Sequence, residues 1–121
     1  MIDLSTRVIA IDFDGCLCEN KWPGCGRPNM AVIKEALREK KRGTKLILWT
    51  CRSDNDLKEA VEYCRRYGLE FDAVNDNVAE RKDAYMNNCR KVWADEYWDD
   101  HAVLKRYEPA RAVGDQNDLF R

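Results

Sequence analysis

The sequence predicts a three-layer α/β fold in which helices cover both faces of a central parallel sheet. Short apolar runs rich in β-branched residues alternate along the chain with longer segments whose apolar residues recur at helical spacing. Each apolar run is typical of a strand buried on both faces, which is the usual situation in a parallel sheet. The order strand, helix, strand, helix, strand, helix, strand favours parallel strands joined by right-handed crossovers.

The first strand and the first helix are separated by a loop rich in glycine and proline. Arg7–Asp12 is the first apolar run and predicts a strand. Residues 15–29 contain three glycines and two prolines, so we expect turns or a small flap there. Helical spacing extends over Met30–Lys41, with Asn29 placed to cap the helix and Gly43 just after its end.

The next two strands flank a second helix. Lys45–Thr50 is an apolar run that ends in a polar residue, and Phe71–Val74 is a shorter strand candidate. Between them, Ser53 occupies an N-cap position and Gly68 follows the end of the helix. One face of this helix is formed by apolar residues at i, i+3, i+4 and i+7: Leu57, Ala60, Val61 and Cys64.

Towards the C-terminus the pattern weakens. Residues 77–88 are weakly helical, and Val92–Trp98 predicts a fourth strand. Residues 101–121 are polar and aperiodic, which predicts a C-terminal extension that either packs along one edge of the fold or is partly disordered. No linker or internal repeat interrupts residues 1–121, so we expect a single domain.

The charge balance gives no reason to expect a nucleic-acid or membrane partner. The chain has 21 basic and 22 acidic residues, for a net charge of -1. It contains no apolar run of the roughly 18–20 residues that a membrane-spanning helix needs. Its first residues do not resemble a signal peptide. We therefore expect a cytoplasmic location, and the sequence leaves the oligomeric state open.

Six cysteines raise the question of disulfides or zinc. Free thiols in a reducing compartment are the favoured interpretation, because most of the cysteines fall in or beside strand and helix patterns. The less favoured alternative is a zinc site at Cys16, Cys18 and Cys25. This C-x-C-x6-C cluster lacks the usual C-x2-C spacing and a fourth ligand nearby in the sequence.

Reactive side chains follow three of the predicted strands. Asp12 and Asp14 close the first, Thr50 ends the second, and Asp99 and Asp100 follow the fourth. In an open parallel sheet, ligands bind beyond the carboxyl ends of the strands. Four carboxylates gathered there would repel one another unless a cation lay among them, and oxygen-only ligands favour Mg²⁺. Such a site allows one carboxylate to attack a phosphate and a second to act as general acid and base.

The same segments resemble signatures of the haloacid dehalogenase superfamily, which has a Rossmann-like α/β fold. IDFDGCL resembles the first signature, D-x-D-G after a hydrophobic strand, and LILWT resembles the second, a strand ending in Thr or Ser. The strand ending in Asp99-Asp100 resembles the acidic fourth signature, so the resemblance covers residues 7 to 100. Many members carry a cap domain. The short intervals between Asp14, Thr50 and Lys82 leave no room for one, so we expect the capless type.

The resemblance implies a role for each matched residue. Asp12 would be the nucleophile, Asp14 the general acid and base, and Thr50 the residue that binds the transferring phosphoryl group. Asp12, Asp99 and the backbone carbonyl of Asp14 would hold Mg²⁺, with Asp100 nearby.

The third signature is a lysine, and here the match is ambiguous. Lys82, Lys91 and Arg81 are the candidates. At about 3.3 Å per residue, an extended strand would place Lys91 roughly 26 Å from Asp99, at the wrong end of the sheet. We therefore favour Lys82, which can reach the carboxyl edge.

The sequence thus predicts a magnesium-dependent phosphatase that hydrolyses a phosphomonoester through an aspartyl-phosphate on Asp12. Its substrate would be a small phosphorylated molecule or a phosphate carried on a larger body. The alternative is a catalytically silent phosphate-binding domain of the same fold. Two further residues keep two interpretations each. Arg52 either contacts substrate or pairs with an acid, and Trp22 either contacts substrate or packs the flap.

Overall fold

A computed structural model describes residues 5–107, apart from the side chains of Ala84 and Tyr85. Four parallel strands lie in the order β3-β2-β1-β4. The strands are β1 (Val8–Ile11), β2 (Lys45–Leu48), β3 (Ala73–Val74) and β4 (Glu96–Trp98). The helices are α1 (Met30–Lys41), α2 (Asp54–Arg66) and α3 (Ala79–Tyr85).

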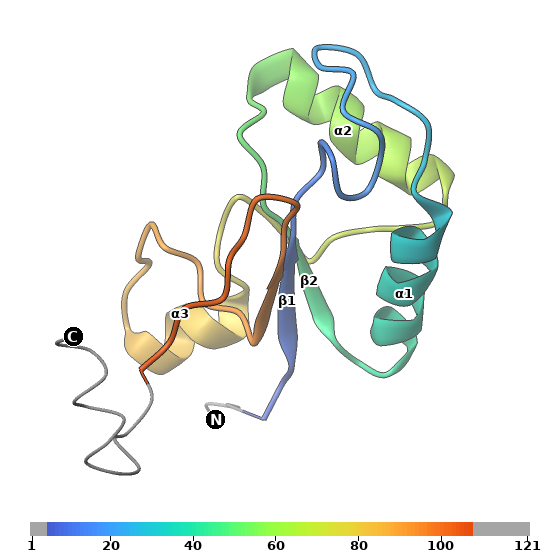
Figure 1. The fold of residues 1–121 in the computed structure, drawn as a ribbon. Coiled ribbons are helices and arrows are strands. Elements are labelled where there is room, and N and C mark those ends of the chain that lie inside the picture. Colours follow the sequence, from blue (N-terminus) through green and yellow to red (C-terminus); the bar gives the residue numbers. More distant parts are fainter. Residues whose placement is uncertain (1–4, 108–121) are drawn as a thin grey trace, which may run out of the picture.

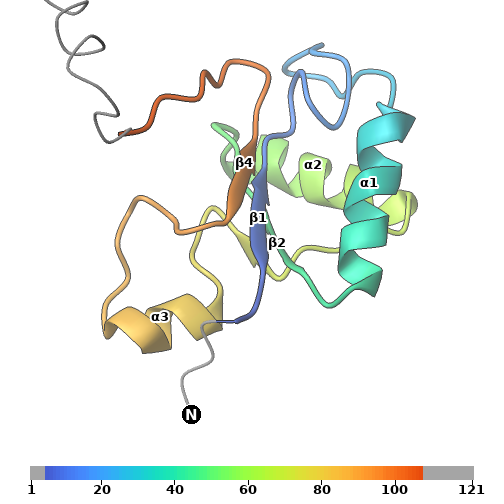
Figure 2. The ribbon, with the colours of Figure 1, turned by 60° about the horizontal axis from the view of Figure 1, so that its bottom comes forward.

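Two hydrophobic cores lie on opposite faces of the sheet, because successive residues of a strand point to opposite sides. Ile9 and Ile11 of β1 pack into the core that α1 and α2 cover. Val8 and Ala10 face the second core, which contains Val78 at the start of α3. Figures 1 and 2 show α3 on one side of the sheet and α1 and α2 on the other. The predicted α/β fold with a parallel sheet flanked by helices is confirmed.

The first helix has the predicted bounds, Met30–Lys41. Asn29 occupies the predicted N-cap position, but its side chain makes no capping hydrogen bond. Its Nδ2 instead donates to the backbone carbonyl of Cys16 at 3.0 Å. The cap residue therefore fastens the loop after β1 to the start of the helix.

The fourth strand is shorter than predicted. Residues 92–95 do not continue β4. The strand β1 begins at Val8, and both backbone polar groups of Val8 bond to Asp95: its N–H donates to the Asp95 carboxylate, and its carbonyl accepts the Asp95 N–H. The peptide groups before Asp95 bond to side chains. The N–H of Trp93 donates to Oδ1 of Asn77 at 2.8 Å, and the carbonyl of Val92 accepts the Tyr97 hydroxyl at 2.6 Å. The prediction of a strand over Val92–Trp98 is therefore wrong in its first half.

The flap, residues 15–29, contains no helix or regular strand, as predicted. Isolated bridges join Cys18 to Asp14 and to Pro28, so the loop folds back on itself. Leu17 and Cys18 are buried in the core beside α1 and α2. On the far side of the loop, the Tyr63 hydroxyl donates to the carbonyl of Gly26 at 2.7 Å. The flap is therefore a fixed part of the fold, attached to α2.

The end of the described chain is exposed. Residues 101–107 follow β4 through a turn and form no helix or strand. The rest of the predicted C-terminal extension, residues 108–121, lies outside the described residues. Within residues 5–107, no helix combines the length and the apolar character needed to cross a bilayer.

Tyr63→Phe should lower the free energy of unfolding by about 1 kcal/mol, because it removes the hydrogen bond that anchors the flap to α2. Urea denaturation followed by circular dichroism measures the change. Tyr107→Phe serves as the control, since that ring is 86% exposed. An unchanged midpoint for Tyr63→Phe would show that water replaces the bond without loss.

Candidate active site

The carboxyl ends of β1 and β4 meet at a switch point of the sheet. From β1 the chain adds β2 and then β3 in one direction, and it returns to place β4 on the other side of β1. The register pairs Ile11 with Trp98, so the next residues, Asp12 and Asp99, are neighbours across the two strands. Crevices at such switch points are where open parallel sheets bind ligands.

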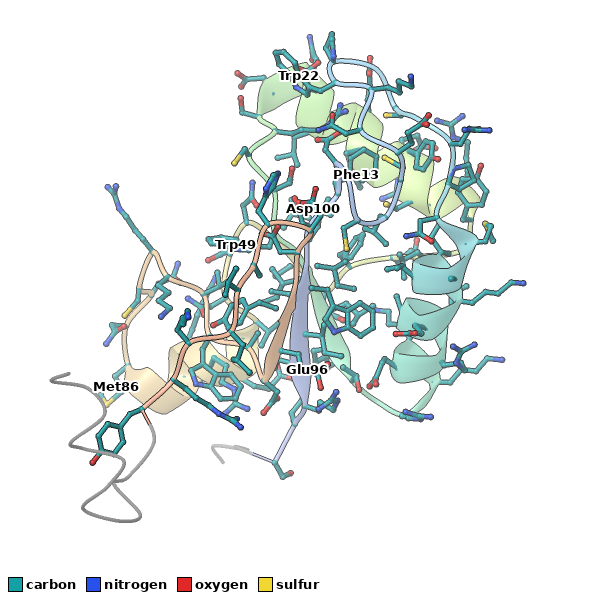
Figure 3. All side chains as sticks on the ribbon, in the orientation of Figure 1. Phe13, Trp22, Trp49, Met86, Glu96 and Asp100 are labelled. Carbon is teal, nitrogen blue, oxygen red and sulfur yellow. The ribbon has the colours of Figure 1, made fainter. Side chains whose placement is uncertain are left out.

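Three acidic side chains converge at this point. Asp12, Asp99 and Asp100 each offer a carboxylate oxygen, and these oxygens lie within 4.8 Å of one another. Gly15 leaves space for the Asp100 carboxylate, because a Cβ at this position would collide with it. The φ of Gly15 is +84°, a backbone conformation that also favours glycine. Figure 3 shows Asp100 at the end of the sheet below the flap, far from Glu96 at the opposite end of β4. We call these three aspartates the acid cluster.

Asp12 is half-buried, and its surroundings disfavour its charged form. Burial is the largest cause that raises the pKa of Asp12, to about 6, and the charges of Asp99, Asp100 and Asp14 add to it. The N–H of Phe13 donates to Oδ1 of Asp12 at 2.9 Å and opposes the shift. A cation among these oxygens would relieve the repulsion. Because the donors of the acid cluster are all carboxylate oxygens, they suit Mg²⁺.

Thr50 lies two residues beyond β2. Its backbone N–H donates at 2.8 Å to Oδ1 of Asn75, a residue that the sequence pattern did not single out. Its hydroxyl oxygen accepts the N–H of Arg52 at 3.1 Å, so the hydroxyl hydrogen can point to a ligand oxygen. Asn75 directly follows β3 and has a φ of +51°. Its place at a strand end is the signal that could have identified it.

Asp14 lies apart from the acid cluster and pairs with Arg52. Both of its carboxylate oxygens accept hydrogen bonds from the guanidinium, at 2.8 Å each. This pairing is the largest cause that raises the pKa of Arg52. The side chain of Arg52 is only 1% exposed. Of the two interpretations open from the sequence, pairing with an acid is the one that the structure shows.

Lys82 lies near the carboxyl edge of the sheet, as expected. Its Nζ pairs with Oδ2 of Asp76 at 2.8 Å, two residues beyond the end of β3. Lys91 lines a groove that runs along β4 from Glu96 to Asp99. The extended strand from which the distance between Lys91 and Asp99 was reckoned does not exist, because β4 begins only at Glu96. Lys82 stays the prediction, with Lys91 as its alternative.

Arg81, the third candidate, points towards the opposite end of the sheet. Its guanidinium lies 3.8 Å above the ring of Trp93, and Nη2 donates to the carbonyl of Thr6 at 2.9 Å. Thr6 precedes β1, so this contact lies at the amino end of the strand.

A pocket of about 280 Å³ lies between the flap and the loop after β2. It is lined by Asp14, Asn20, Trp22, Cys51 and Arg52. The Trp22 side chain lies at the flap's outer end and is 61% exposed. Its ring is therefore free to contact a ligand in this pocket, and it contributes little to the packing of the flap.

All six cysteines lie in the described part of the chain and are free thiols, as predicted. Burial is the largest cause that raises the pKa of Cys16, Cys18 and Cys25, to about 12 for Cys16. These thiols belong to no group of potential metal ligands within residues 5–107. Zinc binds thiolates, and burial disfavours the thiolate form of these cysteines, so the structure favours free thiols over the zinc alternative.

No protein-family model matches the sequence, and no curated protein matches it. Among solved structures, the chain is similar to that of a conserved protein from Bacteroides thetaiotaomicron, with 35% sequence identity and a TM-score of 0.72. The similarity covers 81% of this chain and 78% of that chain. The description of the Bacteroides protein names no activity.

Asp12→Asn should stabilise the metal-free protein at pH 7, because the folded state no longer holds a partly buried charge. Asp ordinarily titrates near pH 4, and in the fold the pKa is about 6. The folded wild type therefore loses stability as the pH rises through this window. We expect a gain on the order of 1 kcal/mol, or roughly 4 °C in Tm, at pH 7 in chelator. The gain should vanish near pH 4. A difference in stability that does not depend on pH would contradict the raised pKa of Asp12.

Proposed function

This chain belongs to the same family as the conserved Bacteroides thetaiotaomicron protein, and we propose that it is a magnesium-dependent phosphatase acting on phosphomonoesters. We further propose that it is a capless phosphatase of the haloacid dehalogenase type that forms an aspartyl-phosphate on Asp12. The proposal rests chiefly on the convergence of the acid cluster at a switch point, with Thr50 following the neighbouring strand β2. Site residues from three separate strand ends favour a phosphate site over solvated turns.

The phosphoryl group would bind next to Asp12. The hydroxyl of Thr50 would donate to one phosphoryl oxygen, since its own oxygen already accepts an N–H. Lys82 would offset negative charge on the phosphoryl group, with Lys91 as the alternative. The leaving group would extend into the pocket beside Trp22.

In the first step, a carboxylate oxygen of Asp12 attacks phosphorus. The bond from phosphorus to the leaving-group oxygen breaks, and Asp14 gives that oxygen a proton. In the second step, a water oxygen attacks the aspartyl-phosphate while Asp14 takes a proton from the water. The bond from phosphorus to Asp12 breaks, which releases phosphate and restores both carboxyl groups.

Mg²⁺ would be held by the carboxylates of Asp12 and Asp99 and by the backbone carbonyl of Asp14, with Asp100 close by. When bound, it would offset the negative charges of the acid cluster and of the phosphate. The pKa of Asp12 supports this, because burial first and the charges of Asp99, Asp100 and Asp14 second raise it, and a cation would favour the charged carboxylate.

The alternative is a phosphate-binding domain without turnover. The pairing of Asp14 with Arg52 favours this alternative, because a carboxylate whose two oxygens both accept hydrogen bonds from a buried guanidinium is typical of a structural ion pair. Asp14 is 17% exposed and lines the pocket, so its carboxylate is accessible from that side. A phosphate-release assay with Mg²⁺ separates the two functions.

Asp12→Asn should fold normally and lose essentially all phosphatase activity, because an amide cannot form the acyl phosphate. Asp14→Asn should lose about 100-fold or more with poor leaving groups and less with good ones. Steady-state release of phosphate measures both effects. Asp83→Asn, an exposed change on α3, is the matched control. Substantial turnover by clean Asp12→Asn would exclude the aspartyl-phosphate mechanism.

Activity should require Mg²⁺ and vanish with chelator. The circular dichroism spectrum should persist, because the fold does not depend on a metal site with oxygen ligands in the way that a zinc–thiolate domain does. Asp99→Ala should raise the half-saturating Mg²⁺ concentration by about tenfold or more. Asp83→Ala, which removes an exposed acid outside the cluster, should leave this concentration unchanged. Dependence on zinc and on Cys16, Cys18 and Cys25 would contradict the magnesium assignment.

A further inference from the structure

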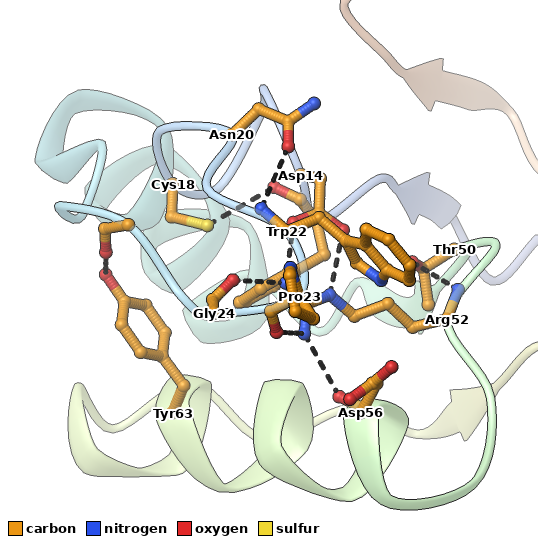
Figure 4. A network of polar contacts seen from close by, with 12 residues as sticks. Asp14, Cys18, Asn20, Trp22, Pro23, Gly24, Thr50, Arg52, Asp56 and Tyr63 are labelled. Atoms are coloured by element: carbon orange, nitrogen blue, oxygen red, sulfur yellow. Dashed lines mark hydrogen bonds and ion pairs between the residues drawn. The ribbon is translucent and has the colours of Figure 1, made fainter.

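Arg52 is a buried arginine whose hydrogen bonds connect distant segments (Figure 4). A guanidinium has five N–H donors. Two of them donate to the carboxylate oxygens of Asp14, and the other three donate to backbone carbonyls. The carbonyl of Gly24 lies 2.6 Å from the donor nitrogen, that of Pro23 lies 3.0 Å away and that of Asp56 lies 3.4 Å away.

These contacts use the full donor capacity of the guanidinium. A phosphate oxygen could bind Arg52 only by displacing Asp14, a carbonyl of the flap or the carbonyl of Asp56. The side chain is 1% exposed, so its charge depends on Asp14 for neutralisation within the described chain. The centroid of the Phe13 ring lies 4.9 Å from the guanidinium carbon, so this ring covers one face of the guanidinium.

The same residue joins the flap to the phosphate end of the site. Pro23 and Gly24 belong to the flap, and Asp56 lies in the first turn of α2. The backbone N–H of Arg52 donates to the hydroxyl oxygen of Thr50. The position of Asp14 is therefore tied to the flap through one side chain.

The geometry leaves one side of the Asp14 carboxylate accessible from the pocket. Each carboxylate oxygen has two lone pairs, and the guanidinium takes one on each. The carboxylate lines the pocket of about 280 Å³ that Trp22 also borders. A leaving-group oxygen in that pocket can reach Asp14 while Arg52 keeps its bonds.

We propose that Arg52 is a positioning residue that fixes the Asp14 carboxylate and the flap as one unit and does not bind the substrate's phosphate. The role in catalysis rests on the proposed phosphatase function, whereas the coupling of Asp14 to the flap does not. Lysine cannot replace Arg52, because an ammonium has three donors and no planar fork to match a carboxylate.

The catalytic half of the proposal predicts a loss that depends on the leaving group. For Arg52→Lys, kcat should fall about 100-fold with glycerol 2-phosphate, which needs protonation. With 2,4-dinitrophenyl phosphate it should fall less than about threefold, and inhibition by inorganic phosphate should keep its constant. Arg81→Gln removes the other arginine that is buried within residues 5–107, on the opposite face, and should affect both substrates equally.

The structural half is tested by hydrogen exchange of the flap amides, followed by mass spectrometry without substrate. Exchange in residues 15–29 should accelerate roughly tenfold in both Arg52→Lys and Asp14→Asn, with α1 unchanged. Arg81→Gln should leave the flap protected. If Arg52→Lys does not fold, Asp14→Asn tests the same link from its other side.

Each outcome decides a different point. Equal losses with both substrates, together with weaker inhibition by inorganic phosphate, would make Arg52 a phosphate ligand and overturn the proposal. Higher activity in Arg52→Lys would make the contact inhibitory and overturn it too. Unchanged flap exchange would remove the coupling. If the wild type hydrolyses neither substrate, the proposed function fails, and the exchange data still decide whether Arg52 couples Asp14 to the flap.

Discussion

Everything at the candidate site depends on negative charges that the sheet forces together. The N–H of Asp12 donates to the carbonyl of Trp98 at 2.8 Å, so the residues that follow β1 and β4 are held side by side by the backbone itself. The pairing of β1 with β4 fixes the two backbones and so keeps the side chains of Asp12 and Asp99 near each other. Burial, and to a smaller extent the neighbouring carboxylates, raise the pKa of Asp12. The fold thus maintains an electrostatic cost at a place where a ligand can relieve it.

The four acids of the candidate site fall into two environments. Three of them share the acid cluster, where like charges lie close together. Asp14 has a counterion in the buried Arg52. Two carboxyl groups separated by one residue in the sequence therefore differ in the charges that surround them. In the mechanism that we propose, this difference separates the nucleophile from the residue that moves protons.

The sequence was sufficient for the order of the elements and for the meeting of Asp12, Asp99 and Asp100, because strand ends are visible as polar residues after apolar runs. It could not define the start of β4, since Val92 and Ala94 are buried as strand residues would be while their peptide groups bond to side chains. The sequence also could not predict which acid pairs with Arg52. The contact with Asp14 depends on the path of the flap, and the periodicity of apolar residues carries no information on that path.

The separation of β1 and β4 along the chain has a consequence for the nascent protein. The N–H of Val8 and the carboxylate of Asp95 that it binds are 87 residues apart. During synthesis, β1 can pair with β2 early, but its second edge stays open until nearly the whole described chain has been made. An open edge of an apolar strand is a template for incorrect pairing, and such long-range parallel contacts form slowly. The strand that carries the candidate nucleophile is therefore the one most exposed to misfolding, and the acid cluster assembles only when the last strand closes the sheet.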